Sequence, residues 1–250
     1  MTISLDSRCN LYSMKPDRRI LSIVGLALVA TTLSGCFNPF VPDVLSQRVT
    51  TLAPRPESPE DAVRLFEWCW VNRGLEEYKG LFTDDYVFLS ALPDSAGNGG
   101  RDVITRRTDE MDTAENMFIG TAEHAPAAKI TLNFDRSLRA QSDTRPNHPD
   151  SLYRLIRTSV DLQVTVDDGN ILEVSGHALF YLVRGDVAVI PPELIAAGVT
   201  PDKKRWWIER WEDETLPESG GVSARRAHPG AAQWTLRTTM ERAKYYFVAR

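Results

Sequence analysis

The side chains best suited to proton transfer are His177, Asp161 and Asp85. In the hairpin described below, His177 lies across from Ser159 and one step diagonal from Asp161, so an Asp–His pair could act as acid and base. The alternative is a solvated polar face on the convex side of a sheet. We favour this alternative and assign no catalytic residue, because the same strand face also carries Gln163, Thr165 and Glu173.

A second set of residues is suited to ligand binding, namely Trp70, Tyr86, Trp207 and Arg210. Ligand pockets are mostly apolar and aromatic, with a few polar groups that fix the ligand's orientation. In this scheme the rings surround an apolar ligand and the arginine orients it. The alternative is that the rings pack in the core, as several of the chain's six tryptophans must.

Metal and cofactor chemistry finds little support. The histidines are scattered and no two stand at ligand spacing; they are His124, His148, His177 and His228. The chain also has no phosphate-binding loop, no Gly-x-Ser-x-Gly and no dinucleotide fingerprint. We therefore expect neither a metal nor a cofactor.

Cys36 points to lipid chemistry. An apolar run over residues 20–30 follows the basic residues Lys15, Arg18 and Arg19, as in a secretory signal, and falls short of the roughly 20 residues that span a bilayer. The segment Leu33-Ser34-Gly35-Cys36 resembles the lipobox of bacterial lipoproteins at all four positions. The resemblance implies that the thiol receives a diacylglyceryl group, that the bond before it is cut, and that the new amino group is a site for acylation.

Residues 1–35 are thus a predicted signal peptide, whose true start we place at Met14 because the first thirteen residues fit a signal poorly. Two or three acyl chains anchor a protein stably, since each buried methylene contributes about 0.8 kcal/mol. We expect the mature chain in the cell envelope, on the exported face of a membrane. Phe37 stands where an inner-membrane retention Asp would, which favours the outer membrane where two exist. An ordinary signal peptide with a chance cysteine is the alternative.

Charge and cysteine usage limit the partners. Four basic and two acidic residues lie before Cys36, which leaves 25 basic and 32 acidic residues and a net charge of −7. This acidity argues against nucleic acid as a partner. Cys9 is removed with the signal peptide and Cys36 is expected to be lipidated, so Cys69 has no disulfide partner. Because Cys69 lies on an apolar helix face, we expect it to be buried and inert.

The remaining chain divides into three parts. Residues 36–57 form a tether rich in proline, which disfavours helix. Residues 58–214 form one domain, which starts with a helix capped by Ser58 with proline in its first turn. Residues 215–250 form an extension that is helical over 234–247. Within the domain, we expect a short second helix near 75–82, a strand at 86–91, a loop at 92–100, a helix at 101–118, and strands at 129–138 and 205–211.

The clearest pattern is a hairpin. Apolar residues alternate with polar ones before and after Asp167-Asp168-Gly169. A three-residue loop with glycine in the left-handed position is a favoured hairpin turn, and it pairs Val164 with Leu172. One residue more or fewer would set Val164 against Glu173, so three residues are predicted.

These elements, with the segments SPEDAVRLF (58–66), YKGLFTDDY (78–86) and WIERWED (207–213), resemble the SnoaL-like group of the nuclear transport factor 2-like superfamily over about residues 58–214. The resemblance implies an α+β fold, in which a cone-shaped, curved antiparallel sheet wraps on N-terminal helices as in cystatin-like folds, with a pocket at the open end. It also suggests a pocket carboxylate at Asp84 or Asp85. Aspartates at a helix-to-strand turn commonly cap backbone amides instead, and we favour that role.

Relatives in this superfamily include isomerases, dehydratases, cyclases and non-catalytic binders, so the fold does not choose among them. Our first hypothesis is a non-catalytic envelope lipoprotein that contacts the lipid membrane through Cys36 and binds a small apolar ligand or a protein partner. The second is an isomerase- or cyclase-type enzyme. A homodimer through the outer sheet face is a further expectation, based on Leu179, Tyr181 and Val183.

Overall fold

The computed structural model describes residues 52–93, 100–122, 125–166, 169–214, 235–237 and 239–247. All of them belong to one compact unit, Leu52–Arg250. The predicted signal peptide, the lipobox and most of the tether lie outside these residues. Within the part of the chain described, no helix has the length and apolarity needed to cross a membrane.

The first helix, α2 (Pro59–Asn72), begins where the sequence predicts. The Ser58 hydroxyl caps it by accepting a hydrogen bond from the Asp61 amide at 3.1 Å. It ends at Arg73, whose left-handed φ of 57° lets its amide donate to the Cys69 carbonyl. The short helix α3 (Leu75–Lys79) follows.

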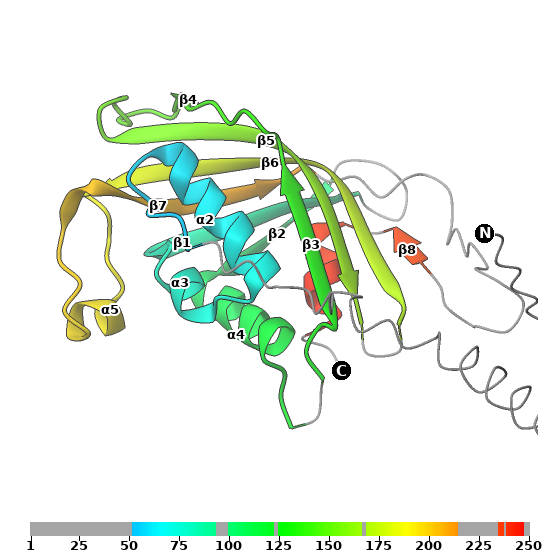
Figure 1. The fold of residues 1–250 in the computed structure, drawn as a ribbon. Coiled ribbons are helices and arrows are strands. Elements are labelled where there is room, and N and C mark those ends of the chain that lie inside the picture. Colours follow the sequence, from blue (N-terminus) through cyan, green and yellow to red (C-terminus); the bar gives the residue numbers. More distant parts are fainter. Residues whose placement is uncertain are drawn as a thin grey trace, which may run out of the picture. The chain divides into compact units, whose positions relative to one another are not determined.

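One curved sheet surrounds these helices in the strand order β2-β1-β7-β6-β5-β3, while β4 pairs with β5 and β8 pairs with β6. The pairs β1–β7 and β6–β8 are parallel and the others are antiparallel. Figure 1 shows the sheet curving around α2, α3 and α4 (Arg107–Phe118). The predicted α+β class, with a curved sheet wrapped on N-terminal helices, is confirmed. The strands are β1 (Phe82–Pro93), β2 (Gly100–Arg106), β3 (Lys129–Phe134), β4 (Gln141–Ser142), β5 (Tyr153–Thr165), β6 (Ile171–Gly185), β7 (Asp202–Asp213) and β8 (Thr235–Arg237).

The hairpin of β5 and β6 has the predicted register. Val164 pairs with Leu172, and the Val166 amide donates to the Asn170 carbonyl at 2.9 Å. Gly169 has a φ of 78°, a conformation that glycine adopts without steric cost. Asp167 and Asp168 lie outside the described residues.

The predicted helix over 101–118 is wrong in its first third. Residues 100–106 form β2, which pairs with β1 from Arg106 opposite Val87 to Gly100 opposite Pro93. The helix α4 therefore begins only at Arg107, and the predicted loop at 92–100 is shorter because β1 runs to Pro93. The run Val103-Ile104-Thr105 is β-branched and suits a strand, so strand pairing outweighs the helical spacing of the apolar residues.

Three other boundaries differ from the predictions. β1 starts at Phe82 instead of residue 86. β3 ends at Phe134 instead of residue 138, and the carbonyls of the next two residues accept hydrogen bonds from Arg64 on α2. The predicted helix over 234–247 is split: residues 235–237 are β8, and α6 (Met240–Tyr245) is the helical part.

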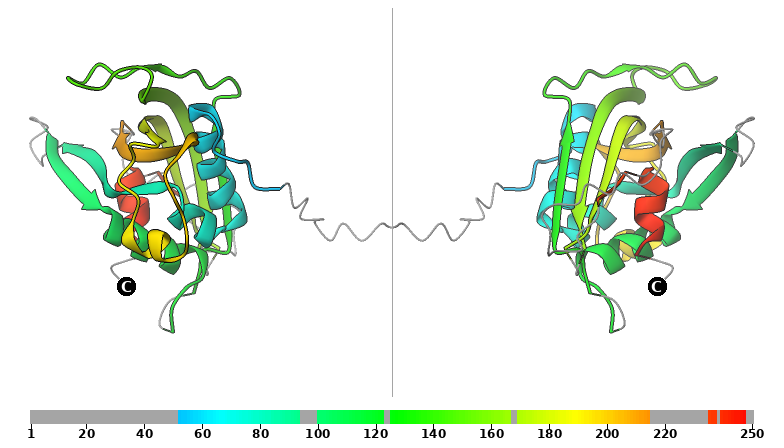
Figure 2. Two further views of the ribbon diagram at one scale, coloured as in Figure 1. Left: turned by 90° about the vertical axis from the view of Figure 1, so that its left-hand side faces the viewer. Right: turned by 90° about the vertical axis from the view of Figure 1, so that its right-hand side faces the viewer.

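The C-terminal helix contributes to the main core. Met240, Ala243 and Phe247 are buried in the same apolar cluster as α2 and the inner face of the sheet. Figure 2 shows α6, in red, next to α4. A second, small cluster of Val183, Ile190 and Trp207 lies where the connection with α5 (Pro192–Ala196) covers β6 and β7.

Candidate functional site

A buried carboxylate forms the centre of the cone interior. Glu110 on α4 is 1% exposed. The Tyr78 hydroxyl of α3 donates to its Oε1 at 2.7 Å, and the Lys244 ammonium of α6 donates to its Oε2 at 2.6 Å. The Tyr86 hydroxyl of β1 reaches the same Oε2 at 3.5 Å. Three helices and one strand thus converge on one acidic group.

Aromatic rings complete this site. The Lys244 nitrogen lies 3.8 Å from the ring centroid of Phe88 and 3.9 Å from that of Trp211. Phe88 and Trp211 are register partners on β1 and β7, and their rings meet edge to face at 4.8 Å. A cation over aromatic faces is attracted by the ring quadrupole. We call Glu110, Tyr78, Tyr86, Phe88 and Trp211 the ammonium cage.

The two phenols of the cage remain neutral. Burial raises the pKa of Tyr78 and of Tyr86 well above the usual range, and the negative charge of Glu110 raises both further. Each hydroxyl therefore stays a hydrogen-bond donor near neutral pH. The cage contains one carboxylate and two neutral phenols, so it favours a single cation.

Glu110 and Lys244 are not among the residues predicted from the sequence, although a signal exists for both. Glu110 stands three, four and seven residues before Thr113, Ala114 and Met117, all buried on α4. Lys244 stands between Met240 and Phe247 on the buried side of α6. A charged residue within an apolar helical stripe must find a partner when it is buried. Two such residues in separate helices predict a buried ion pair.

The structure separates the four predicted ligand-binding residues. Trp70 and Tyr86 are both 1% exposed in the cone interior, linked through the rings of Tyr78 and Phe82. Trp207 is buried in the second cluster. Arg210 is partly exposed, pairs with Glu212 and lies 5.4 Å from the ring centroid of Tyr181.

The three predicted acid–base residues lie outside the interior. His177 is opposite Ser159, as predicted, but His177, Asp161 and Asp85 are all exposed. The Ser159 hydroxyl donates to the neighbouring Asp135 at 2.5 Å; the hydrogen bonds from Ser159 are the main reason that the pKa of Asp135 is lowered, with His177 a smaller contributor. This face matches the solvated polar surface that we favoured.

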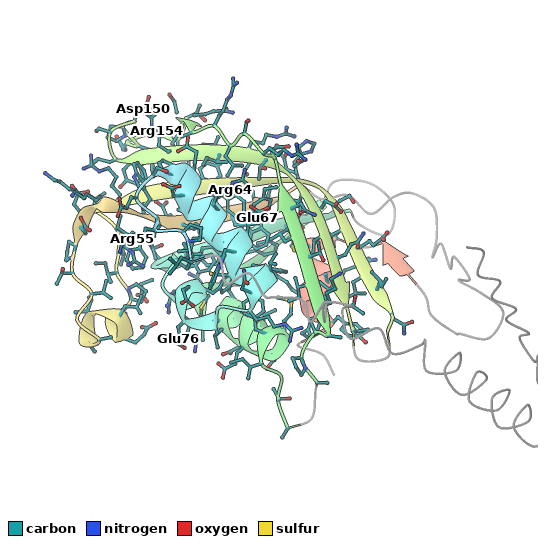
Figure 3. All side chains as sticks on the ribbon, viewed as in Figure 1. Arg55, Arg64, Glu67, Glu76, Asp150 and Arg154 are labelled. Carbon is teal, nitrogen blue, oxygen red and sulfur yellow. The ribbon has the colours of Figure 1, made fainter. Side chains whose placement is uncertain are left out.

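Asp161 also borders a surface hollow of about 520 Å³. Arg64 and Glu67, an ion pair at 2.6 Å on α2, form one side of it, and Figure 3 shows their side chains close together. Glu67 also accepts from the Phe134 amide at 3.0 Å. The charges around the hollow are mixed, and Arg64 and Glu67 are already paired with each other, so the hollow offers no single ligand chemistry.

Several other predictions concern cysteine, metals and the outer face. Cys69 is buried; burial, with a smaller effect of Glu77, raises the pKa of its thiol, which disfavours the reactive thiolate. The residues described hold no group of three side chains fit to bind a metal ion.

On the predicted dimer face, Val183 is covered by the chain's own α5 connection. A homodimer remains a prediction, as does the lipidation of Cys36.

No family model matches this chain, and no curated protein matches it. Among solved structures, a conserved protein from Planctomyces limnophilus is 16% identical over 63% of this chain and 96% of its own, with a TM-score of 0.39. A nuclear transport factor 2-like superfamily protein from Salmonella enterica is 14% identical over 65% and 92%, with a TM-score of 0.40. A hexachlorocyclohexane dehydrochlorinase from Novosphingobium barchaimii is 9% identical over 65% and 89%, with a TM-score of 0.40. Similarity this low supports no conclusion about substrate or chemistry.

Proposed function

We propose that this chain is an envelope lipoprotein, anchored through an acylated Cys36, whose cone is a non-catalytic binding domain for a small and mostly apolar ligand. The lipobox and the preceding apolar run support the anchor. The observation that carries the binding role is that the cone interior is largely aromatic and apolar around the ion pair of Glu110 and Lys244. This is the usual composition of a ligand pocket.

The state of Glu110 argues against catalysis. A general base needs a free lone pair within reach of a substrate proton. Here one carboxylate oxygen accepts from Tyr78 and the other from Lys244. Each oxygen keeps a further lone pair, but the carboxylate is only 1% exposed, so a substrate could reach it only after neighbouring side chains move.

The helix α6 marks the space that a ligand would take. It inserts Met240 and Ala243 into the interior, where Phe247, which follows the helix, is also buried. It is the only described helix that follows the predicted domain of residues 58–214. A ligand that displaces these side chains would contact the apolar residues that now surround them. Binding and movement of α6 are thus coupled in this proposal.

An apolar fluorescent probe tests the binding role. Phe247→Ala removes a buried ring just beyond α6, which leaves apolar space inside the cone. We expect this variant of the full chain to bind N-phenyl-1-naphthylamine more tightly than the wild type. The matched control is Ile119→Ala, since Ile119 is 58% exposed and its truncation opens no cavity. Equal probe binding by all three proteins would refute the proposed binding chamber.

The anchor is tested separately. Intact-mass spectrometry of the membrane fraction is expected to show a chain that begins at Cys36 and carries acyl mass. Cys36→Ser should lack this mass and leave the membrane fraction. A mature chain that starts elsewhere, or that carries no acyl mass, would contradict the lipoprotein assignment.

The alternative is an isomerase- or dehydratase-type enzyme in which Glu110 is the base, and the observation that favours it is a buried carboxylate facing two phenols. This alternative predicts that a ligand co-purified with the wild type is chemically converted on incubation, whereas Glu110→Gln retains it unchanged. Recovery of the same unchanged ligand from the wild type supports the binder.

A further inference from the structure

The side chain of Lys244 sits in the ammonium cage as a ligand would. It is 6% exposed, its nitrogen is 2.6 Å from the Glu110 carboxylate, and two aromatic faces lie within 4 Å of it. A carboxylate with flanking rings is the arrangement by which proteins recognise organic ammonium groups.

We infer that the ammonium cage is a binding site for the ammonium head of a small aliphatic amine, and that Lys244 is its built-in occupant. The inference rests on the proposed function, because it names the head group of the ligand that the cone would bind. The aliphatic part of that ligand takes the apolar space that α6 now fills.

The cage is independent of its occupant. Glu110, Tyr78, Tyr86, Phe88 and Trp211 come from α4, α3, β1 and β7, all within residues 75–213. The register of β1 and β7 positions Phe88 beside Trp211, and ring contacts such as Phe82 against Tyr86, 4.5 Å apart, position Tyr86. No residue of α6 is therefore part of the cage itself.

The helix that supplies Lys244 is short. It spans six residues, a length at which an isolated helix is marginal. Among the described residues, Thr239 caps the start of the helix at 3.3 Å, and the Asn116 amide donates to the carbonyl of Phe247, which follows it, at 3.1 Å. A competing ammonium ligand thus acts against a helix that has little stability of its own.

The chemistry of the cage selects for a cation. Inside the protein, the attraction between an ammonium and Glu110 is stronger than in water, and the ring faces of Phe88 and Trp211 add to it. A neutral alcohol gains neither contribution, and a carboxylate would face repulsion from Glu110. Ammonium compounds should therefore bind in clear preference to neutral or anionic ones of equal size.

Chemical rescue of a truncated lysine tests the inference. Lys244→Ala in the full chain deletes the atoms from Cγ to Nζ, which are the atoms of n-propylammonium. We expect millimolar n-propylammonium to raise the Tm of this variant by several degrees, increasing with concentration, relative to sodium chloride at equal ionic strength. The affinity should fall about tenfold or more in Lys244→Ala/Glu110→Gln, since a charge-assisted hydrogen bond is lost.

Controls separate the cage from general salt effects. Lys129 is exposed on β3, so Lys129→Ala should show no shift, and 1-propanol should not rescue Lys244→Ala. Should Lys244→Ala fail to fold alone, recovery of its near-ultraviolet circular dichroism on refolding in n-propylammonium becomes the readout. Equal rescue by 1-propanol, equal rescue of the double variant, or no rescue overturns the inference.

The outcome can be told apart from that of the proposed function. Probe binding by Phe247→Ala without rescue of Lys244→Ala would support the apolar binding chamber and refute the proposed ammonium head group. Rescue of Lys244→Ala without probe binding by Phe247→Ala would support the ammonium cage and refute the proposed apolar ligand.

Discussion

The buried pair of Glu110 and Lys244 yields the most informative stability prediction. Lys244→Met keeps a long side chain in place but removes the cation, which leaves a carboxylate that is 1% exposed with only phenol donors. Breaking a buried ion pair by removing one partner costs about 3–5 kcal/mol. For a domain of about 200 residues, this corresponds to a fall in Tm of about 6–20 °C.

The double variant Glu110→Gln/Lys244→Met separates this charge penalty from lost packing. Replacement of a buried pair by neutral groups of similar volume is often close to neutral, so we expect the double variant to regain most of the lost stability. The coupling between the two sites should then be about 2 kcal/mol or more. Lys129→Met, at an exposed position, should change the free energy of unfolding by less than about 0.5 kcal/mol.

Urea denaturation followed by tryptophan fluorescence measures these free energies. The signal is favourable because Trp70 and Trp211 are buried in the cone interior. A cost below about 1 kcal/mol for Lys244→Met, or single-variant costs that simply add in the double variant, would show that α6 does not hold its ammonium in the cage.

Three further predictions concern other parts of the domain. Burial acts to raise the pKa of Asp143, but hydrogen bonds and charge from Arg145 leave it below its ordinary value. The pair therefore stabilises the fold above pH about 4, and this contribution is lost as the pH falls. Acid denaturation curves of Arg145→Met should lack that loss. Burial raises the pKa of Tyr78. The wild type should therefore lose stability as the pH rises above about 10, where tyrosine in the unfolded chain ionises. Above this pH, the urea midpoint of Tyr78→Phe should fall less steeply than that of the wild type. A Cβ at Gly185 would lie 2.6 Å from the Asp202 carbonyl oxygen, so Gly185→Ala should cost about 1–3 kcal/mol; an unchanged Tm would contradict the register at this end of β6 and β7.

Local sequence rules predicted the parts of the fold whose causes are local. The start of α2 followed from Ser58 and Pro59, and the register of the β5–β6 hairpin followed from the alternation of apolar residues and one glycine turn. Residues 101–106 were mispredicted as helix because their state is decided by pairing with β1, a partner that lies outside any local window.

The candidate site could be predicted only in part. Tyr86 was identified and belongs to the cage, whereas Trp70 was identified and lies inside the cone but outside the cage. Glu110 and Lys244 were passed over because a charged side chain is ordinarily assigned to the solvated side of a helix. Their partnership spans 134 positions in the sequence, so only the folded chain shows that each neutralises the other.

Native mass spectrometry of the full chain, extracted in detergent from the membranes in which it is made, tests the binding role most directly. We expect a small amine that is bound to the wild type, released unchanged on denaturation, and depleted from Glu110→Gln. A wild type that carries no small molecule, or a ligand that Glu110→Gln retains in full, would contradict it.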